Sequence, residues 1–393
     1  MKFQTNFSHA ASSGLAGLVW YAKLLRMATV ALFLPAFGAG AQTVRYTWTG
    51  RGATDLMSDP MNWESMDSPN HKSNAGEIIF GPLDPGAHQS VGVDSLDNLG
   101  PILFAKGAPA MTLRPVEPNN GRIQMAHLNE PIRLANQSGS PQTFQIQLHA
   151  FWNPDEIISV RRWETPGGDF DFQAPVILRE GPLNPSSREM IWELVATGNM
   201  AFKGGVLATD AWPEGTKLCL IKSGTGRVTF LAETRWKGSA LAEEGVLAPE
   251  ARWEMTGDLE IALAATLEGR GQIEAPTKVR GKVAPGGEAI ATLTFTKGLE
   301  LAGTTEIGLD PKNRSSDLLR ITSGPLTYGG VLRVTANEKS AKFTSGQVFQ
   351  IFEWKEKENA PKGSFSKMDL PTLPIGMRWK DQLSKDGTLI VGP

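Results

Sequence analysis

The sequence predicts an all-β protein built as a parallel β-helix, and three observations predict it. The chain has 42 glycines and 26 prolines in 393 residues, so turns interrupt it throughout. The segments between the turns are short and rich in β-branched and aromatic residues. From Met190 onward they recur at roughly 8–14 residues with no helical segment between them, a cadence typical of sandwiches, barrels and solenoids.

Alternating residues identify individual strands. Val228 and Phe230 fall on one face of "RVTFLAE", and Leu293 and Phe295 on one face of "ATLTFTKGLEL". The turns "SGTG", "EGRG", "PGG" and "SGPLTYGG" supply positive φ angles that glycine adopts at little cost. In "GDLEIALAATLEGRGQIEAPTKVRGKVAPGG" very short strands meet at glycine corners, which favours a solenoid; stacked β-sandwich domains are the alternative.

Residues 1–41 have the order of a secretory signal peptide. Lys23 and Arg26 precede the apolar run Met27–Phe37, and Ala39-Gly40-Ala41 predicts cleavage after Ala41. The run is shorter than the roughly 20 residues that span a bilayer, although a signal anchor is the alternative. Met27 is an alternative start because the segment before it is long. We therefore expect an exported chain, extracellular or at the cell surface with the periplasm as the alternative, whose mature part does not span a membrane.

The mature sequence divides into two regions. Residues 42–189 form a less regular N-terminal β-rich region and cap, and residues 190–393 form the β-helix region with a C-terminal closing segment. The polar, proline-containing segment Arg179–Met190 is a linker between domains or a long loop. The charged segment Glu353–Gly363 is predicted to be a loop that leaves the last coils and blocks edge pairing.

Charge and cysteine content exclude several classes of partner. Without the leader the chain has 36 basic and 41 acidic groups, a net charge of −5, and no basic block. Nucleic acid and anionic membranes are therefore not expected partners, and the oligomeric state stays open. The single cysteine, Cys219, cannot form an internal disulfide or a cysteine metal cluster, and its apolar flanks predict a buried, inert thiol.

Several motifs occur in an order that resembles bacterial exported proteins with autotransporter-associated β-strand repeats. "YTWTGRG" followed by "SDPMNW" is similar to the opening of that family, and "GEIIFGP" to its next strand. The match is fuller from "LEGRGQIEAPTKVRGKVAPGGEAIATLTF" through "SSDLLRITSGPLTYGGVLRV" to the closing "KDGTLIV". The resemblance implies a right-handed parallel β-helix of the passenger type with a structural or adhesive role. The sequence ends at "TLIVGP" without the membrane barrel of autotransporters.

The sequence offers no local motif for a catalytic, cofactor or metal site. The histidines of the mature chain, His71, His88, His127 and His149, lie far apart and form no metal-binding spacing. Walker, dinucleotide-binding and GxSxG motifs are absent. We therefore assign no catalytic residue, no cofactor-binding residue, no metal ligand and no cofactor, and regard the chain as uncertain but not expected to be an enzyme.

Carboxylates and tryptophans are the candidates for a site assembled from distant coils. Asp169 and Asp171 in "GGDFDFQ" share a strand face about 7 Å apart, a spacing compatible with paired glycosidase acids. "LAEEGVLAPEARWE" adds four further acids: Glu243, Glu244, Glu250 and Glu254. For these four, and for Asp169 and Asp171, a solvated strand face is the simpler interpretation. Trp236 and Trp253 lie beside charges and are the tryptophans expected to be exposed, where they could stack on sugars.

The opening segment "YTWTGRGATDLMSDPMNW" is predicted to be the N-terminal lid of the solenoid. Trp48 and Trp63 would cover the end of the core, Gly50 and Gly52 would make the turn, and the loop residues Asp55 and Asp59 would serve as turn and solubilising residues. Three functions follow from the sequence: a non-catalytic structural or adhesive surface protein, a polysaccharide lyase or hydrolase on a β-helix, or a glycan-binding module. The expected partner is an extracellular polysaccharide or a cell-surface glycan.

Overall fold

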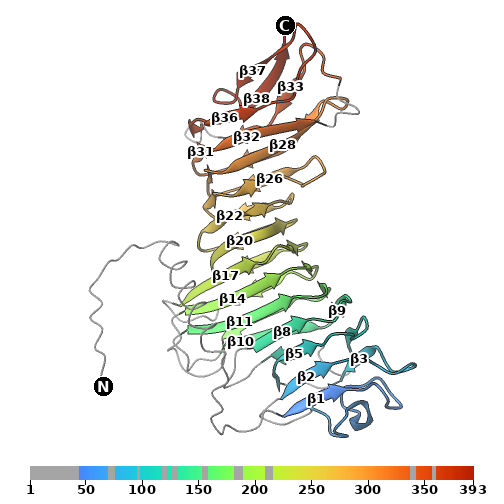
Figure 1. Cartoon of the computed structure of the whole chain (residues 1–393). Helices are drawn as coiled ribbons and strands as arrows, with labels where there is room; N and C mark the ends of the chain where they lie inside the picture. Colours follow the sequence, from blue (N-terminus) through green and yellow to red (C-terminus); the bar gives the residue numbers. More distant parts are fainter. Residues whose placement is uncertain are drawn as a thin grey trace, which may run out of the picture. The chain divides into compact units, whose positions relative to one another are not determined.

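The computed structural model describes residues 44–69, 76–94, 98–116, 122–125, 132–152, 158–180, 189–208, 216–336, 342–355 and 360–393. The predicted leader, residues 1–41, lies outside the described residues. The chain divides into two units, Met1–Gln42 and Thr43–Pro393, and everything below concerns the second. That unit is a parallel β-helix, which confirms the predicted fold class and excludes stacked β-sandwiches (Figure 1).

Apart from the two end coils, each coil contributes one strand segment to each of three parallel ladders. The first ladder contains β1 (Arg45–Trp48), β2 (Glu77–Phe80), β5 (Ile102–Phe104), β8 (Ile132–Asn136), β11 (Ile158–Thr165), β14 (Glu189–Ala196), β17 (Lys217–Ser223), the first halves of β20 (Gly238–Pro249) and β22 (Leu259–Leu267), β24 (Thr277–Val279), β27 (Leu299–Leu301), β31 (Leu326–Tyr328) and β35 (Lys362–Gly363).

The second ladder follows the first around a corner in every coil. It contains β3 (Ser90–Val93), β6 (Thr112–Pro115), β9 (Gln142–Phe144), β12 (Phe170–Phe172), β15 (Asn199–Phe202), β18 (Arg227–Phe230), the second halves of β20 and β22, β25 (Lys282–Val283), β28 (Thr304–Asp310), β32 (Val331–Ala336) and β36 (Lys367–Asp369). Because β20 and β22 each run through the corner, the first two ladders form one sheet.

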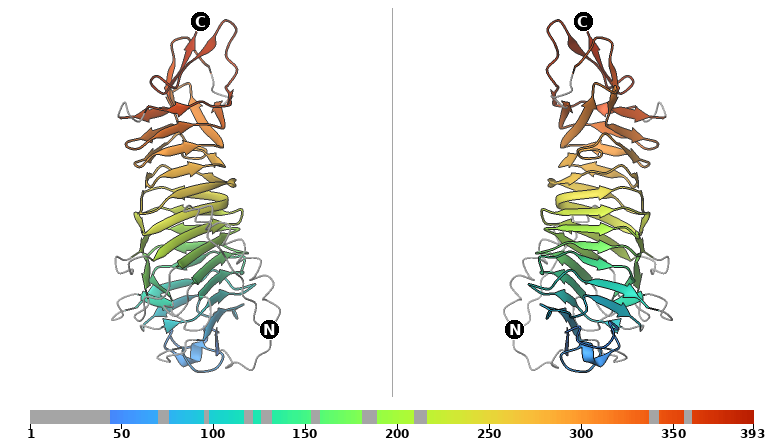
Figure 2. Two further views of the ribbon diagram at one scale, coloured as in Figure 1. Left: turned by 90° about the vertical axis from the view of Figure 1, so that its left-hand side faces the viewer. Right: turned by 90° about the vertical axis from the view of Figure 1, so that its right-hand side faces the viewer.

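The third ladder is a separate sheet. It contains β4 (Asn98–Leu99), β7 (Arg122–Met125), β10 (Gln147–Trp152), β13 (Val176–Glu180), β16 (Val206–Ala208), β19 (Thr234–Trp236), β21 (Arg252–Met255), β23 (Gln272–Glu274), β26 (Thr292–Phe295), β30 (Leu318–Ile321) and β34 (Phe352–Trp354). Figure 2 shows the stacked strands of the unit from two sides.

Short elements close the two ends of the helix. The 3-10 helix η1 (Pro60–Asn62) lies in the N-terminal lid. At the C-terminal end, β33 (Val348–Gln350), β37 (Arg378–Gln382) and β38 (Thr388–Gly392) form a three-stranded antiparallel sheet. The two-residue strand β29 (Ser315–Ser316) pairs antiparallel with the end of β28.

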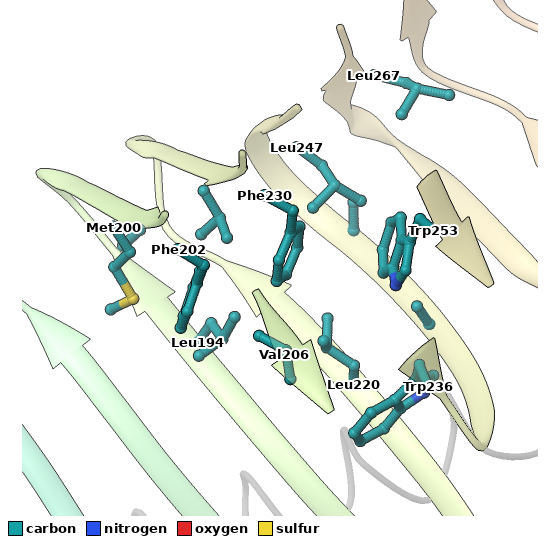
Figure 3. Close-up of a cluster of buried hydrophobic side chains, with 14 of the residues drawn as sticks. Leu194, Met200, Phe202, Val206, Leu220, Phe230, Trp236, Leu247, Trp253 and Leu267 are labelled. Carbon is teal, nitrogen blue, oxygen red and sulfur yellow. The ribbon is translucent and has the colours of Figure 1, made fainter. Parts of the chain in front are cut away.

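The interior is a continuous column of apolar side chains. Inward residues alternate with outward ones, as in β18, where Val228 and Phe230 are fully buried, and in β26, where Leu293 and Phe295 are. Parallel stacking places like residues on like residues, so Phe144, Phe172, Phe202 and Phe230 form a row of rings 4.8–5.2 Å apart. Figure 3 shows the part of this column that contains Phe202 and Phe230.

The ladders extend over both regions that the sequence analysis separates at residue 189/190. β11 pairs with β8 on one side and with β14 on the other, so the stacking continues across the segment Arg179–Met190, of which 181–188 lies outside the described residues. In the segment Glu353–Gly363, the first and last residues belong to β34 and β35, so the prediction of a loop is wrong at both ends; 356–359 is outside the described residues.

Candidate functional site

The N-terminal lid covers the first coil with two tryptophans, as predicted. Trp48 and Trp63 are each 1% exposed, their rings meet edge to face at 5.2 Å, and Trp48 also contacts Phe80 of the next coil. Gly50 makes the turn with φ +62°. Gly52 has another role, because a Cβ there would lie 2.6 Å from the Asp59 carboxylate.

The two lid carboxylates hold the lid in place. Asp59 caps η1 by accepting a hydrogen bond of 3.0 Å from the Met61 amide, which lowers the pKa of that carboxyl. Asp55 accepts two hydrogen bonds, of 2.8 and 2.6 Å, from the Arg114 guanidinium on β6. Asp55 therefore forms an ion pair with a residue of another coil, in addition to the role of turn residue that the sequence predicts. The two carboxylates thus have structural roles in the lid.

Asp169 and Asp171 are each held by a partner of their own. Asp169 accepts a hydrogen bond of 2.7 Å from the Asn199 amide, and Asp171 pairs with Lys203 at 2.8 Å. Asp171 also accepts from Gln173 at 2.9 Å. The expected placement on one strand face fits the structure, since Phe170 between them points into the core. A free pair of acids is not formed.

The four glutamates of "LAEEGVLAPEARWE" do not converge on one site. Glu250 pairs with Arg270 at 2.8 Å, and Glu254 lies 3.3 Å from Arg252. Glu244 contributes its backbone carbonyl to a buried lysine, described below. Glu243 has interactions of its own. The carboxylates of Glu250 and Glu254 belong to ion pairs on the outside of the helix.

The prediction that Trp236 and Trp253 are exposed is wrong. They are 2% and 0% exposed and point into the core shown in Figure 3. The Trp236 indole donates a hydrogen bond of 2.9 Å to the Ser239 carbonyl, and Trp253 stacks on Phe230 at 5.1 Å. Both are inward residues of the third ladder, because their charged neighbours take the outward positions. Neither can serve as a sugar platform.

Cys219 and the described histidines do not form a metal site. Cys219 is buried, as predicted, and burial raises the pKa of its thiol to about 12. His88 contacts the Gly52 carbonyl at 3.1 Å, whereas His71 and His127 lie outside the described residues. His149 is 2% exposed; burial, followed by the charges of Arg179 and Arg122, lowers its pKa to about 4. Within the described ranges no three His, Cys, Asp or Glu side chains could share a metal ion.

The corner between the first and second ladders is a track of glycines. A Cβ on Gly303 would lie 2.0 Å from the Gly281 carbonyl oxygen, and one on Gly330 would lie 1.9 Å from that of Gly303. Gly226 stands in the same relation to Gly198, at 1.9 Å. Side chains are therefore absent where the coils stack most closely, and the corner is hollowed.

Two grooves follow this glycine track. The first, of about 350 Å³, lies over Gly139, Gly167 and Gly198 and is bordered by Asp169. The second, of about 450 Å³, lies over Gly281, Gly303 and Gly330; we call it the corner groove. The side chains that form its walls include Leu263, Arg280, Lys282, Val331 and Arg333.

The corner groove is positively charged at its walls. It is lined by three cations and by no carboxylate. Arg280 pairs with Glu260 at 3.3 Å, and Lys282 lies 3.6 Å from Glu306. Arg333 is exposed and forms no ion pair within the part of the chain that the structure describes. Leu263, 83% exposed, adds an apolar edge. The arrangement can bind an anionic, partly apolar chain and has no acid–base pair.

Lys222 is a buried cation in the same corner, nearer the middle of the unit. Its side chain is fully buried, and the ammonium group donates to the carbonyls of Gly224 and Gly226, at 2.5 and 2.7 Å, and to that of Glu244. Burial lowers the pKa of this lysine to about 8. Lys222 thereby donates to three carbonyls of the glycine corner, of which the Gly226 carbonyl also accepts a hydrogen bond of 3.0 Å from the Val246 amide.

Sequence reasoning missed the cations of the corner groove. The signal was present in "KVRGKV", in which a glycine corner is flanked by Arg280 and Lys282. Arg333 could not be added, because its place beside them depends on which coils stack, and the repeat length varies along the chain. From the sequence alone, Lys222 would be assigned as a surface lysine at the end of an apolar run.

No protein-family model matches the chain, and a search of curated proteins finds no match. In the ranges that the structure describes, no helix is long and apolar enough to cross a membrane.

Proposed function

We propose that this chain is a non-catalytic, exported protein of the cell surface or extracellular space with a structural or adhesive role. The signal-peptide order of residues 1–41 supports export. The resemblance of the sequence to proteins with autotransporter-associated repeats is consistent with this role. The proposed partner is an extracellular polysaccharide or a cell-surface glycan.

One observation carries the proposal: Asp169 and Asp171, the acid pair that the sequence offers for glycoside cleavage, each take part in contacts with the next coil. A paired-acid mechanism needs one carboxyl that can give a proton and another that is free to act as nucleophile or base. Asp169 and Asp171 instead accept hydrogen bonds from Asn199 and Lys203. These contacts link one coil to the next, which supports a role in building the helix.

The test is a depolymerisation screen. The purified full chain is incubated with a panel of neutral and acidic polysaccharides, and the release of reducing ends and of unsaturated sugars is measured. We expect no release above buffer. Turnover that disappears in the Asp169→Asn, Asp171→Asn double variant, but not in a Glu250→Gln variant, would overturn the proposal in favour of an enzyme.

Glycan binding is the second candidate, and the corner groove favours it. Three cations, an exposed leucine and bare glycine backbone form a groove that fits an anionic polysaccharide better than a neutral one. The groove replaces the tryptophan platform, which the burial of Trp236 and Trp253 excludes.

Binding is measured by retention of the full chain on immobilised polygalacturonate at constant ionic strength. We expect the Lys282→Gln, Arg333→Gln double variant to lose most of the retention. Lys203→Gln, at an ion pair on another coil, is the matched control and should keep it. Equal retention of the double variant and of the Lys203→Gln control would exclude the corner groove as the polysaccharide-binding site.

A further inference from the structure

Three polar side chains gather on the outer face of the third ladder, and no described residue pairs with them as an opposite charge. Arg122 is on β7, His149 on β10 and Arg179 on β13, which are adjacent strands. In the register, Arg122 is opposite Gln147 and Arg179 is opposite Phe151. His149 is two residues from each of these positions, so the three side chains lie on one diagonal with the imidazole in the middle.

The cluster contains hydrogen-bonding atoms that are buried and unused. The Nε of Arg122, the Nε of Arg179 and the Nδ1 of His149 are all buried without a hydrogen-bond partner. Neither arginine forms an ion pair within the residues that the structure describes. His149 itself is 2% exposed. Buried polar groups are ordinarily hydrogen-bonded, so three such atoms on adjacent strands make this cluster a candidate ligand site.

The unused atoms define what that ligand must offer. Each arginine Nε–H is a donor and requires an acceptor, for which an anionic oxygen is best. The His149 Nε2–H donates to Gln147 Oε1 at 3.2 Å, so in the neutral imidazole Nδ1 is an acceptor. The ligand must therefore carry anionic oxygens and, close to them, one hydroxyl group that donates. Sulfate lacks that donor.

We propose that Arg122, His149 and Arg179 form a binding site for a sugar acid, the carboxylate of a uronate lying between the two guanidiniums and a ring hydroxyl donating to His149 Nδ1. The site is on the outer face of the third ladder, whereas the corner groove is between the first and second ladders. The inference does not depend on the proposed function, because a uronate site is compatible with an adhesive protein and with an enzyme.

The experiment follows the imidazole of His149 directly. The full chain is labelled with ¹⁵N-histidine, the His149 resonances are assigned by their loss in His149→Gln, and glucuronate is added at pH 7 and constant ionic strength. We expect a saturable change at His149 Nδ1 while the ring stays neutral and protonated at Nε2. Glucose, which lacks the carboxylate, should cause no change at equal concentration.

The Arg122→Gln, Arg179→Gln double variant should bind glucuronate at least about tenfold more weakly, since two charge-assisted hydrogen bonds are lost. Arg235→Gln, on the same face but in an ion pair with Glu233, is the control and should bind normally. If the double variant does not fold, Arg122→Lys and Arg179→Lys keep the charge, lose the Nε donor and should each weaken binding.

Two results would overturn the proposal. No change at His149 with glucuronate removes the site. An equal response to sulfate and glucuronate shows a site for any oxyanion and removes the sugar-acid assignment. Loss of polygalacturonate retention in the corner-groove variant leaves this experiment unaffected, so the two sites are tested separately.

Discussion

Within the unit, four long coils between Ile102 and Lys222 are followed by four short coils between Lys222 and Leu301, and the two groups fill their interiors differently. In the first ladder the residues in register Ile102, Leu134, Trp163, Leu194 and Lys222 are 32, 29, 31 and 28 residues apart. From Lys222 the next partners are Ala242, Ile261, Val279 and Leu301, only 20, 19, 18 and 22 residues apart.

Much of the difference in coil length lies in the corner between the third and first ladders and in the strands of the first ladder. The long coils have five residues between β10 and β11 and eight between β16 and β17, whereas the short coils have two between β23 and β24 and three between β26 and β27. Strands of the first ladder also shorten, from eight residues in β14 to three in β24.

The interior changes with the size of the coil. A larger cross-section must be filled to the same density, and aromatic side chains do this in the long coils. The ring row continues from Phe144 through Phe230 to Trp253 at the first short coils. Beyond it, in the described residues 259–334, the buried aromatics are Phe295 and Tyr328, and the remaining buried apolar residues are aliphatic. Coil length and core volume are therefore matched.

The largest expected effect comes from removing a ring in the long coils. Phe202 stacks between Phe172 and Phe230 at 4.8 and 5.1 Å, so Phe202→Ala should lower the free energy of unfolding by about 3–5 kcal/mol. Phe295→Ala, in the short coils, removes an equally buried ring with no aromatic neighbour in the described chain. Its cost should be smaller by about 0.5–1.5 kcal/mol.

Urea unfolding followed by circular dichroism measures both variants, and an unchanged slope shows that the same surface unfolds. Equal losses for the two variants would contradict the idea that the long coils depend on aromatic stacking.

A smaller effect is expected where the coil length changes. Lys222 is at this step, and Lys222→Met should cost roughly 2–3 kcal/mol because the Gly224 and Glu244 carbonyls lose the ammonium donor, while the Gly226 carbonyl keeps its hydrogen bond from the Val246 amide. Lys203→Met removes only a half-exposed ion pair and should cost less than about 1 kcal/mol. Thermal unfolding of the two variants side by side tests this; a neutral Lys222→Met would mean that water replaces the ammonium group.

Two buried titratable groups should make stability respond to pH in opposite directions. His149 in the long coils has its pKa lowered to about 4, so the stability it contributes is complete above pH 6.5 and is lost as the pH falls toward 4. Asp317, in the coil of 27 residues that follows the short coils, has its pKa raised to about 6 by burial, so its contribution is complete below pH 3.8 and is lost as the pH rises through 6.

Between pH 4 and 6 each slope approaches at most about 1.4 kcal/mol per pH unit. Stability is measured by urea unfolding from pH 4 to 8 in the parent and in two variants. Relative to the parent, His149→Gln should gain stability toward low pH and Asp317→Asn should lose it. Parallel curves for the parent and either variant would show that the group does not titrate differently on folding.

The same comparison explains what the sequence could predict. Glycine corners, alternation as in Val228 and Phe230, and the spacing of the short coils predict the β-helix from residue 190 onward. The sequence does not reveal a repeat in the long coils, because the number of residues per coil changes from one coil to the next. Trp236 and Trp253 were misplaced because charged neighbours alone do not identify the face of a residue; the register does. The cluster of Arg122, His149 and Arg179 spans 58 positions and exists only through that register.

The smallest effect is expected on the outer face of the short coils. Arg252 pairs with Glu233 at 2.8 Å and with Glu274 at 2.7 Å, and Glu254 lies 3.3 Å away. All four side chains are partly exposed, so solvent and salt weaken each pair. Arg252→Gln should therefore lower the free energy of unfolding only slightly, and less at high salt.

Unfolding at low and at high sodium chloride measures this effect, with Arg270→Gln, which breaks the single pair to Glu250, as the control. A loss from Arg252→Gln that exceeds that of Lys222→Met would reverse the order proposed here. It would mean that rows of charges on the outer face, and not the filling of the interior, hold the short coils together.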